Sequence, residues 1–431
     1  MGFALAVGMI MVLITAVSRV RFLQWVVPFL AGGGCLLVMG VGVTMGASIP
    51  VLLLASLQTL LIPITWTSPH LPVHRRTDVL ALQLAVTAGA IGMVTAHDWV
   101  SFFISLELVS IISVVLVWFG RRPEVCIEAA VKYFVMSAMV TGVLVLGMAC
   151  VLVDTGQMGF PLVMGGTWLS SVGFVLVAVS LLTKVGVMPF HWWVVDVYSV
   201  PSPYIVAHLS TIPKLAAVVV LMMLMGAAHP LMMPLPGAWV LIGLVSALGG
   251  ALAAVVYTKP SYVLAASSMS QMGLLFLLPA THSPYMVEVT LWGMAVYGVT
   301  SVVLWFVLDR VDVPKGLARS APALMFLSGL ALLSMMGIPP FPGFLSKALL
   351  IKELLWSGWW VMLGVVVSVL VGAMAYIRLF RTMITGHEPP VQLSLPTQWV
   401  AGILLVVMGC GTVYPDCLMW PVHWVSEHCL L

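Results

Sequence analysis

The amino-acid sequence predicts an all-α protein that crosses a membrane about fourteen times. Hydrophobic residues make up 62% of the 431 residues and charged residues only 7%, whereas soluble domains carry about 25% charged residues. The apolar residues gather into stretches of about 20, the length that a helix needs to cross the hydrocarbon core of a bilayer. The lysines and arginines between these stretches fall on alternate loops, which is typical of a polytopic membrane protein.

Fourteen spans result when the chain is divided at charged residues and at Pro- or Gly-rich segments. The first stretch has no basic leader and no small-residue cleavage site, so we expect a retained span rather than a removed signal peptide. The twelfth stretch is too long for one straight helix, and the motif GIPPFPGF interrupts it. The expected spans are residues 3–18, 24–45, 48–66, 78–97, 99–119, 127–153, 170–195, 203–228, 238–257, 261–279, 286–308, 320–355, 360–383 and 396–414.

The positive charges of the loops all follow odd-numbered spans. The opposite loops contain acidic residues but no lysine or arginine. By the positive-inside rule the basic side faces the cytoplasm, so both termini face outward. Another number of spans would have broken this alternation, which therefore supports fourteen. The loop cations are Arg19, Arg21, Arg75, Arg76, Arg121, Arg122, Lys259, Arg310, Lys315, Arg319, Arg378 and Arg381.

Several functional classes are disfavoured by the composition. A net charge of +3 spread over the whole chain does not predict nucleic-acid binding, and no Gly-rich phosphate loop is found. The six cysteines form no CxxC pair, which argues against an iron–sulfur cluster. The tail DCLMWPVHWVSEHC leaves a metal site or a Cys417–Cys429 disulfide open, but its spacing fits no standard zinc pattern and favours a loose tail. Its candidate ligands are Asp416, Cys417, His423, His428 and Cys429.

Four charged side chains fall near the middle of expected spans. They are Glu107, Lys184, Lys214 and Lys347. Each charge at the bilayer centre costs about 2.5–3.5 kcal/mol on insertion scales, so such groups are retained when they are paired, hydrated or functional. The structural alternatives are a Glu107–lysine pair that holds helices together, or lysines satisfied by backbone carbonyls.

Four further polar residues have stronger structural alternatives. Lys132 and Lys352 lie near span ends, where a lysine can extend its ammonium to the headgroups. His191 and His208 are equally compatible with core histidines.

Prolines interrupt the spans that carry the central lysines. Pro189 follows Lys184, Pro213 directly precedes Lys214, and Pro339 precedes Lys347. Unwound backbone inside a membrane is tolerated only where protein or a wet cavity satisfies it. Interrupted helices in corresponding places of two halves indicate an ion pathway between inverted repeats. With Pro189 and Pro339 as the matched breaks, we expect two five-helix inverted repeats, helices 4–8 at 78–228 and helices 9–13 at 238–385, flanked by helices 1–3 at 1–70 and by helix 14 with the tail at 396–431.

The central cations are lysines rather than arginines, which suits proton handling. Burial disfavours the charged form of an amine, and a nearby carboxylate favours it again. A change in the separation of Glu107 and Lys184 would therefore switch Lys184 between holding and releasing a proton. Arginine stays charged and cannot serve in this way.

Five motifs resemble a known family. They are TKVGVMPFHWWVVDVY, STIPKLAAVVVL, EAAVKYF, SYVLAASSMSQMG and GIPPFPGFLSK. They are similar to motifs of the antiporter-like membrane subunits of respiratory complex I, and most similar to those of subunit N of bacterial NADH:quinone oxidoreductase. The resemblance covers roughly residues 75 to 385, and the span count agrees along the whole chain.

The resemblance implies fourteen helices, of which helices 7 and 12 are broken, and a mid-membrane proton path driven by quinone reduction in neighbouring subunits. Glu107 and Lys184 would be the input pair, Lys214 the central carrier and Lys347 the outer exit group. Lys132 would tune the pair. His191 would help to connect the water chain.

The family also implies the surroundings of the chain. It would lie in the bacterial inner membrane with other complex I subunits, lipid, protons and internal water as its partners. It would itself bind neither NADH nor flavin, while NADH, FMN, iron–sulfur clusters and quinone would be used elsewhere in the complex.

Two departures from the family pattern affect specific residues. The family has W-x-P-D after P-F-H, whereas this chain has WWVVD, which puts the bend before Asp196 in doubt. Subunit N often has histidine where this chain has Gln271, and glutamine cannot titrate. Two alternatives remain open: a subunit of an Mrp-type cation/proton antiporter or of a membrane-bound hydrogenase, and a membrane anchor without transport, against which the cost of the central lysines argues.

Overall fold

A computed structural model describes residues 48–120, 123–161, 167–227, 236–281, 285–311, 314–355, 358–385 and 394–413. The expected spans 3–18 and 24–45 and the C-terminal tail lie outside these ranges. Within them the regular structure is helical, apart from one isolated bridge between Asp98 and Gly159. In chain order the helices are α3 (Ile49–Trp66), α4 (Val73–Val94), α5 (Trp99–Trp118), α6 (Pro123–Thr155), α7 (Trp168–Val185), α8 (Trp192–Tyr198), α9 (Pro203–Leu209), α10 (Ile212–Ala227), α11 (Pro236–Val256), α12 (Pro260–Thr281), α13 (Met286–Arg310), α14 (Leu317–Ser320), α15 (Pro322–Met336), α16 (Pro342–Leu354), α17 (Trp359–Ile384) and α18 (Leu395–Val413).

The structure is that of an all-helical, multi-pass membrane protein. Ten helices of the described part are long and apolar enough to cross a membrane, and two shorter apolar helices cover 322–336 and 395–409. Every expected span from 48–66 onward has a helix, or a pair of half-helices, within a few residues of its predicted bounds. The total of fourteen stays a prediction, because its first two spans lie outside the described residues.

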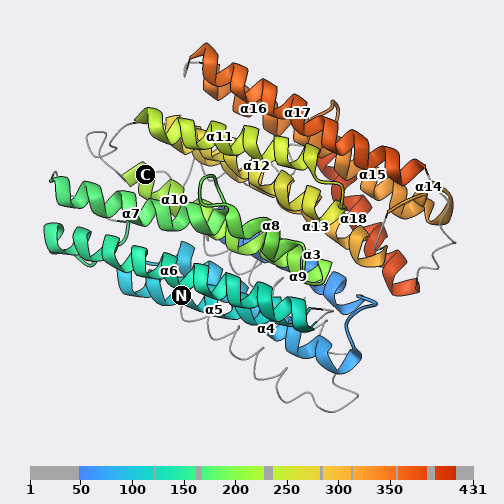
Figure 1. Ribbon diagram of the computed structural model, residues 1–431, viewed down its shortest axis with the longest axis horizontal. Helices are drawn as coiled ribbons and strands as arrows, with labels where there is room; N and C mark the ends of the chain where they lie inside the picture. Colours follow the sequence, from blue (N-terminus) through green and yellow to red (C-terminus); the bar gives the residue numbers. More distant parts are fainter. Residues whose placement is uncertain are drawn as a thin grey trace.

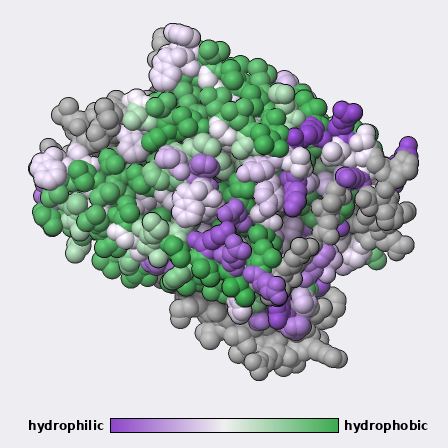
Figure 2. Space-filling view, viewed as in Figure 1, coloured by the Kyte–Doolittle hydropathy of each residue, from purple (hydrophilic) through white to green (hydrophobic). Residues whose placement is uncertain are grey.

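The helices lie side by side, with α4 to α6 along one edge and α15 to α17 along the opposite edge (Figure 1). Burial separates central from peripheral helices. In the segment Pro203–Gly226, which contains both α9 and α10, 94% of the apolar stretch is buried inside the protein, against 28% in α17. The face in Figure 2 is mostly apolar, and hydrophilic side chains gather toward one end. Lipid therefore suits the outer helices, while α10 forms the protein interior.

Glycines allow α11 and α12 to pack closely. A Cβ atom added to Gly250 would lie 2.4 Å from the amide nitrogen of Ser270. One added to Gly273 would lie 2.5 Å from the amide of Ala247. Small residues of this kind let helix backbones approach each other in membranes, so α12 is held at a fixed distance from its neighbour.

The two expected breaks are present and share one main-chain turn. α7 ends at Gly186 and α15 ends at Gly337, both left-handed with φ of 81° and 79°. In each turn the glycine amide donates to the carbonyls three and four residues earlier. In each turn the amide of Phe190 or Phe341 then donates to the carbonyl three residues before it. This register matches Pro189 with Pro340, so pairing Pro189 with Pro339 was wrong by one residue.

A third interruption lies between α9 and α10. Pro213 has no amide hydrogen, so the Leu209 carbonyl four residues earlier has no partner in the helix. The Tyr198 hydroxyl donates to that carbonyl at 3.0 Å. A side chain from α8 thus satisfies the backbone group that the proline leaves open, as buried backbone in a membrane requires.

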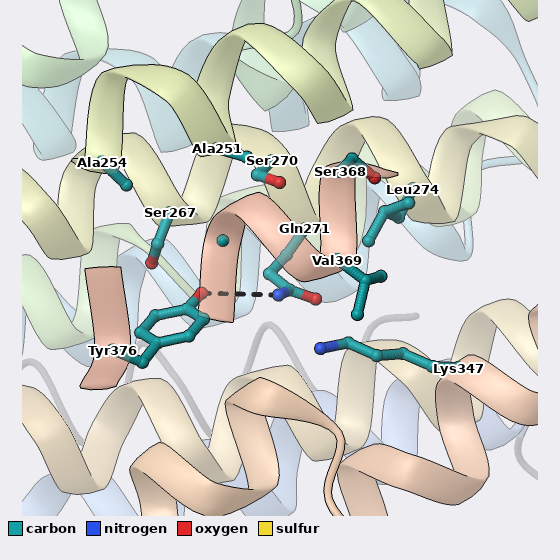
Figure 3. A pocket seen from close by; sticks show the side chains of 11 residues that line it. Ala251, Ala254, Ser267, Ser270, Gln271, Leu274, Lys347, Ser368, Val369 and Tyr376 are labelled. Carbon is teal, nitrogen blue, oxygen red and sulfur yellow. Dashed lines mark hydrogen bonds between the residues drawn. The ribbon is translucent and has the colours of Figure 1, made fainter. Parts of the chain in front are cut away.

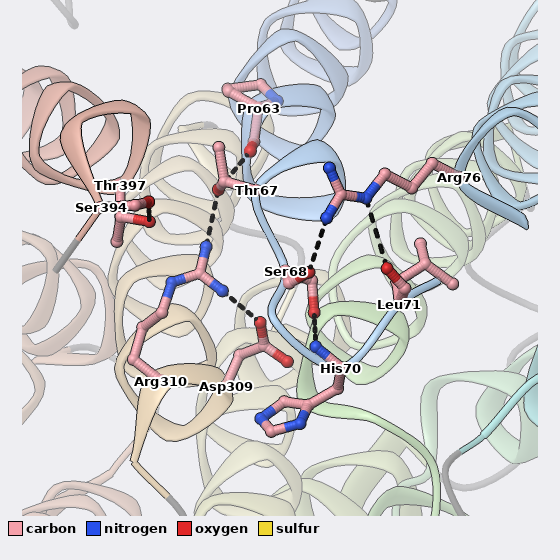
Figure 4. Close-up of polar contacts among 10 residues, drawn as sticks. All are labelled: Pro63, Thr67, Ser68, His70, Leu71, Arg76, Asp309, Arg310, Ser394 and Thr397. Carbon is pink, nitrogen blue, oxygen red and sulfur yellow. Dashed lines mark hydrogen bonds and ion pairs between the residues drawn. The ribbon is translucent and has the colours of Figure 1, made fainter. Parts of the chain in front are cut away.

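Two arginines of other helices bind residues just after the end of α3 (Figure 4). Arg310 donates to Asp309 and to Thr67, which follows α3. Arg76, at the start of α4, donates to the carbonyls of Ser68 and Leu71. The end of α13 and the end of α3 therefore lie on the same side, as the alternation of loop charges predicts.

Candidate functional site

Glu107 lies in the third turn of α5 and is half-buried. The helix begins after Asp98, whose carboxylate accepts from the Ser101 amide at 2.7 Å and the Ser101 hydroxyl at 2.6 Å. These bonds hold the pKa of the Asp98 carboxyl below its usual range. The Thr141 hydroxyl of α6 donates to the Glu107 carboxylate. Glu107 is therefore held toward α6, part-way along the span.

Lys184 lies in the last turn of α7, two residues before the first break. Its ammonium donates to the Ser110 hydroxyl at 2.7 Å and to the Ser137 hydroxyl at 3.0 Å. Within the described structure Glu107 and Lys184 form no ion pair, although the two charges interact across the gap. Thr141 follows Ser137 by one helical turn, so hydroxyls line the space between the carboxylate and the ammonium.

Lys214 lies in the first turn of α10 and is fully buried. Its ammonium donates to the Ser268 hydroxyl of α12 at 2.9 Å. It also lies 5.0 Å from the ring centroid of Tyr198, within the range of a cation–π contact. Tyr198 thus supports both the interrupted backbone and the ammonium that follows it.

Lys347 lies in α16, beyond the second break, and is half-buried. Its ammonium donates to the carbonyl of Met335, in the last turn of α15. The last carbonyls of a helix lack partners within the helix and carry partial negative charge, so they stabilise a cation. The first half of the broken helix therefore supplies the acceptor for the lysine of the second half.

A small cavity of about 10 Å³ lies beside Lys347. Ser267, Gln271 and Tyr376 are among the side chains that line it (Figure 3). The Gln271 amide nitrogen lies 3.5 Å from the Tyr376 hydroxyl. A cavity of this volume has room for about one water, so the polar groups here are one water or less apart.

The surroundings of Glu107 and of the three central lysines contain hydroxyl-bearing side chains that the sequence analysis did not identify. Serine, threonine and tyrosine are common in membrane helices and carry no charge, so composition does not single them out. Their spacing relative to a charged residue was the available signal, since Ser110 follows Glu107 by three residues and shares its helix face. The missed residues are Ser110, Ser137, Thr141, Tyr198, Ser268, Tyr297 and Tyr376.

Lys132 pairs with carboxylates other than Glu107. It is exposed and forms ion pairs with Glu128 at 2.8 Å and Asp196 at 3.5 Å. α6 has 33 residues and so spans about 50 Å, more than the hydrocarbon core of about 30 Å. Lys132 is nine residues from its start, near the edge of that core. A role in tuning Lys184 stays a prediction.

The histidines occupy two different environments. His191 lies at the first break, half-buried, with its Nδ1 atom 3.3 Å from the Pro189 carbonyl. His208 is fully buried in α9, and neither ring nitrogen has a hydrogen-bond partner. Lys352 is exposed in the last turn of α16, near the ring of Tyr285.

Among the residues that the structure describes, no three His, Cys, Asp or Glu side chains gather in a way that could hold a metal ion. The candidate ligands of the tail, from Asp416 to Cys429, lie outside the described residues. The charged and hydroxyl-bearing residues of the described site are one carboxylate, three amines and a set of hydroxyls, groups that accept, hold and pass on protons.

A sequence model of the NADH:quinone oxidoreductase/Mrp antiporter transmembrane family matches residues 96–372, more than half of the chain. The chain belongs to this family. Its relatives within the family include subunit N of NADH-quinone oxidoreductase from Neisseria gonorrhoeae, 32% identical over 71% of this chain and 67% of that protein. The subunit N from Alkalilimnicola ehrlichii is 30% identical over 79% of this chain and 75% of that protein.

Two solved structures contain chains with the same fold. A chain of respiratory complex I from Thermus thermophilus superposes with a TM-score of 0.84, 22% identity and coverage of 96% of this chain and 98% of that one. A chain of the Mrp complex from Dietzia superposes with a TM-score of 0.87, 19% identity and coverage of 97% and 95%. The fold is therefore common to both branches of the family, and the choice between them rests on sequence.

Proposed function

We propose that this chain is a proton-translocating membrane subunit of NADH:quinone oxidoreductase, of the subunit N type. One observation carries the proposal. Lys184, Lys214 and Lys347 each lie at an interrupted membrane helix, and each donates to neutral oxygens rather than to a carboxylate.

Neutral acceptors matter because of what they do to the charge. A carboxylate pair would hold a lysine permanently as ammonium, whereas hydroxyls and carbonyls solvate the ammonium without cancelling its charge. Such a lysine exchanges its proton when a nearby charge moves. Glu107 is the carboxylate in place to do this for Lys184, with the Lys214 and Lys347 amines farther along the chain as central carrier and exit group.

The energy comes from elsewhere in the complex. The relatives at about 30% identity are named as subunits of a quinone oxidoreductase, and quinone reduction in neighbouring subunits would move the charge that acts on Glu107. NADH, FMN, iron–sulfur clusters and quinone belong to those subunits. The chain would lie in the bacterial inner membrane with both termini on the periplasmic side.

The proposal includes two inverted repeats, residues 78–228 and 238–385, with broken helices 7 and 12 in a fourteen-helix subunit. The matched glycine turns at Gly186 and Gly337 support this division. The segments 1–70 and 396–431 would flank the repeats.

The second candidate is a cation/proton antiporter subunit of the Mrp type or a membrane-bound hydrogenase arm. The Mrp complex chain superposes as well as the complex I chain does, which favours keeping this candidate. Purification in mild detergent separates the candidates, because a flavin subunit that oxidises NADH co-purifies only with the oxidoreductase.

The test replaces Lys214 and Glu107 separately by alanine. We expect the subunit to assemble and NADH-driven proton uptake into vesicles to fall about ten-fold or more, the scale of losing a proton-transfer group. Lys352→Ala is the control, because Lys352 is exposed at a helix end. Wild-type proton uptake and NADH oxidation in both Lys214→Ala and Glu107→Ala would refute the proposal.

A further inference from the structure

Lys214 and Lys347 both lie beside α12. Lys214 donates to Ser268 of this helix, and the cavity beside Lys347 is lined by Ser267 and Gln271 of the same helix. Gln271 has no titratable group, so a proton that passes α12 needs other carriers. The described residues supply two phenols in this place, Tyr297 of α13 and Tyr376 of α17.

Tyr297 lies near Ser268, the partner of Lys214. Its side chain is buried, with 3% exposed, and its hydroxyl makes no direct hydrogen bond. The hydroxyls of Ser210, Ser268 and Ser301 lie around it, and Ser210 and Ser301 are 3.2 Å apart. A buried phenol without a fixed partner, among hydroxyls that can rotate, is free to accept from one neighbour and donate to another.

Tyr376 lies at the cavity beside Lys347. It is 2% exposed, interacts with Ser267 and lies 3.5 Å from the Gln271 amide nitrogen. Its hydroxyl and the Lys347 ammonium line the same cavity of about 10 Å³, which has room for about one water (Figure 3). Tyr376 interacts with Ser267, and Tyr297 lies near Ser268, so the two phenols lie beside consecutive residues of α12.

We propose that the hydroxyls of Tyr297 and Tyr376 form the proton-conducting connection between Lys214 and Lys347, a role that rests on the proposed function. Ser268 joins Lys214 to Tyr297, the adjacent hydroxyl of Ser267 continues the connection to Tyr376, and a single water joins Tyr376 to Lys347. One proton leaves the Lys214 ammonium and one arrives at the neutral Lys347 amine. Each hydroxyl between them accepts one proton and donates its own, so both phenols end neutral and no electron moves.

The test replaces each tyrosine by phenylalanine, which keeps the ring and removes only the hydroxyl. The whole complex is purified through this chain and reconstituted in liposomes. We expect Tyr297→Phe and Tyr376→Phe each to lower NADH-driven proton uptake about ten-fold or more, with the subunit present at wild-type amounts on a native gel. Tyr262→Phe is the matched control, because Tyr262 packs on Tyr257 at the start of α12, away from both lysines.

A rescue separates proton transfer from packing. Gln271→His places a titratable ring beside the Lys347 cavity, so we expect it to restore proton uptake at least in part to Tyr376→Phe. Gln271→Leu removes the amide that lies 3.5 Å from the Tyr376 hydroxyl and lines the cavity, and it leaves both phenols in place. The water between Tyr376 and Lys347 then loses a polar partner, so we expect proton uptake to fall. This variant decides the question if a tyrosine variant does not assemble.

Wild-type proton uptake in both tyrosine variants, or in Gln271→Leu, would overturn the connection. Failure of Gln271→His to restore any proton uptake to Tyr376→Phe would also overturn the connection. Loss of uptake in Lys214→Ala together with normal uptake in the tyrosine variants would leave the proposed function standing and reject only the connection. Normal uptake in both Lys214→Ala and Glu107→Ala would reject the function itself.

Discussion

The two broken membrane spans share a turn but place their lysines on different half-helices. Lys184 precedes Gly186 by two residues, whereas Lys347 follows Gly337 by ten. With the glycines aligned, Met335 occupies the place of Lys184. Lys347 donates to the carbonyl of Met335, so it reaches back to the residue that aligns with Lys184. Each break thus has a lysine, but the lysine lies on a different half-helix.

The breaks also differ in what satisfies their backbone. The Met188 amide of the first break donates to the Ser246 hydroxyl of α11 at 2.7 Å. In the second break the Gly343 amide donates to the Ser334 hydroxyl of the preceding half-helix at 3.1 Å. The first break is therefore tied to a helix from the other half of the chain, and the second is closed within its own span.

The largest expected effect comes from adding a side chain at Gly343, where the two half-helices of the second break are in close contact. A Cβ atom on Gly343 would lie 1.8 Å from the Ser334 carbonyl oxygen, so Gly343→Ala should lower the free energy of unfolding by more than about 3 kcal/mol. The measurement is the amount of subunit in the membrane and its thermal stability in detergent.

The matched control is Gly142→Ala, since nothing lies within 4 Å of a Cβ atom there. The first break has Trp192 at the aligned position and so does not need a glycine. Normal stability of Gly343→Ala would mean that the half-helices of the second break are farther apart than described.

The next effect tests whether the two lysines do the same work from their different helices. Arginine retains the charge but does not release a proton, so Lys184→Arg and Lys347→Arg should each lower proton uptake about ten-fold. Uptake in liposomes containing the whole complex is the measurement, with Lys352→Arg as the control. Normal uptake in Lys184→Arg alone would show that the first break needs only a fixed charge.

The smallest expected effect concerns the two serines that accept hydrogen bonds from the backbone of the breaks. Ser246→Ala leaves the buried Met188 amide without its acceptor, and should cost about 1 kcal/mol of stability. Ser334→Ala should cost a similar amount in the second break. Melting of the purified subunit checks both, with Ser171→Ala on the outer face of α7 as the reference. A change in only one variant would show that the two breaks are not equally dependent on their serines.

The sequence alone predicted where the helices lie and which charged residues fall within them, for a physical reason. A span needs about 20 apolar residues and a central charge is costly, so both leave marks that composition reveals. Glu107, Lys184, Lys214 and Lys347 all lie within helices or at breaks as expected.

The contacts between helices could not be predicted in the same way. Ser110 and Ser137 bind Lys184 from two different helices, and nothing in a single sequence states which helices are neighbours. The matching of Pro189 with Pro340 was missed because two prolines stand together, and only the hydrogen-bond register of the turn decides between them.

The narrow cavity beside Lys347 has a consequence for energy conservation. Each proton that returned across the bilayer would dissipate about 2.3 kcal/mol for every 100 mV of membrane potential. A space of about 10 Å³ has room for about one water and not for a continuous file of water. A hydrated ion is therefore too large for it, and a leak of protons would have to pass through the few side chains that line it.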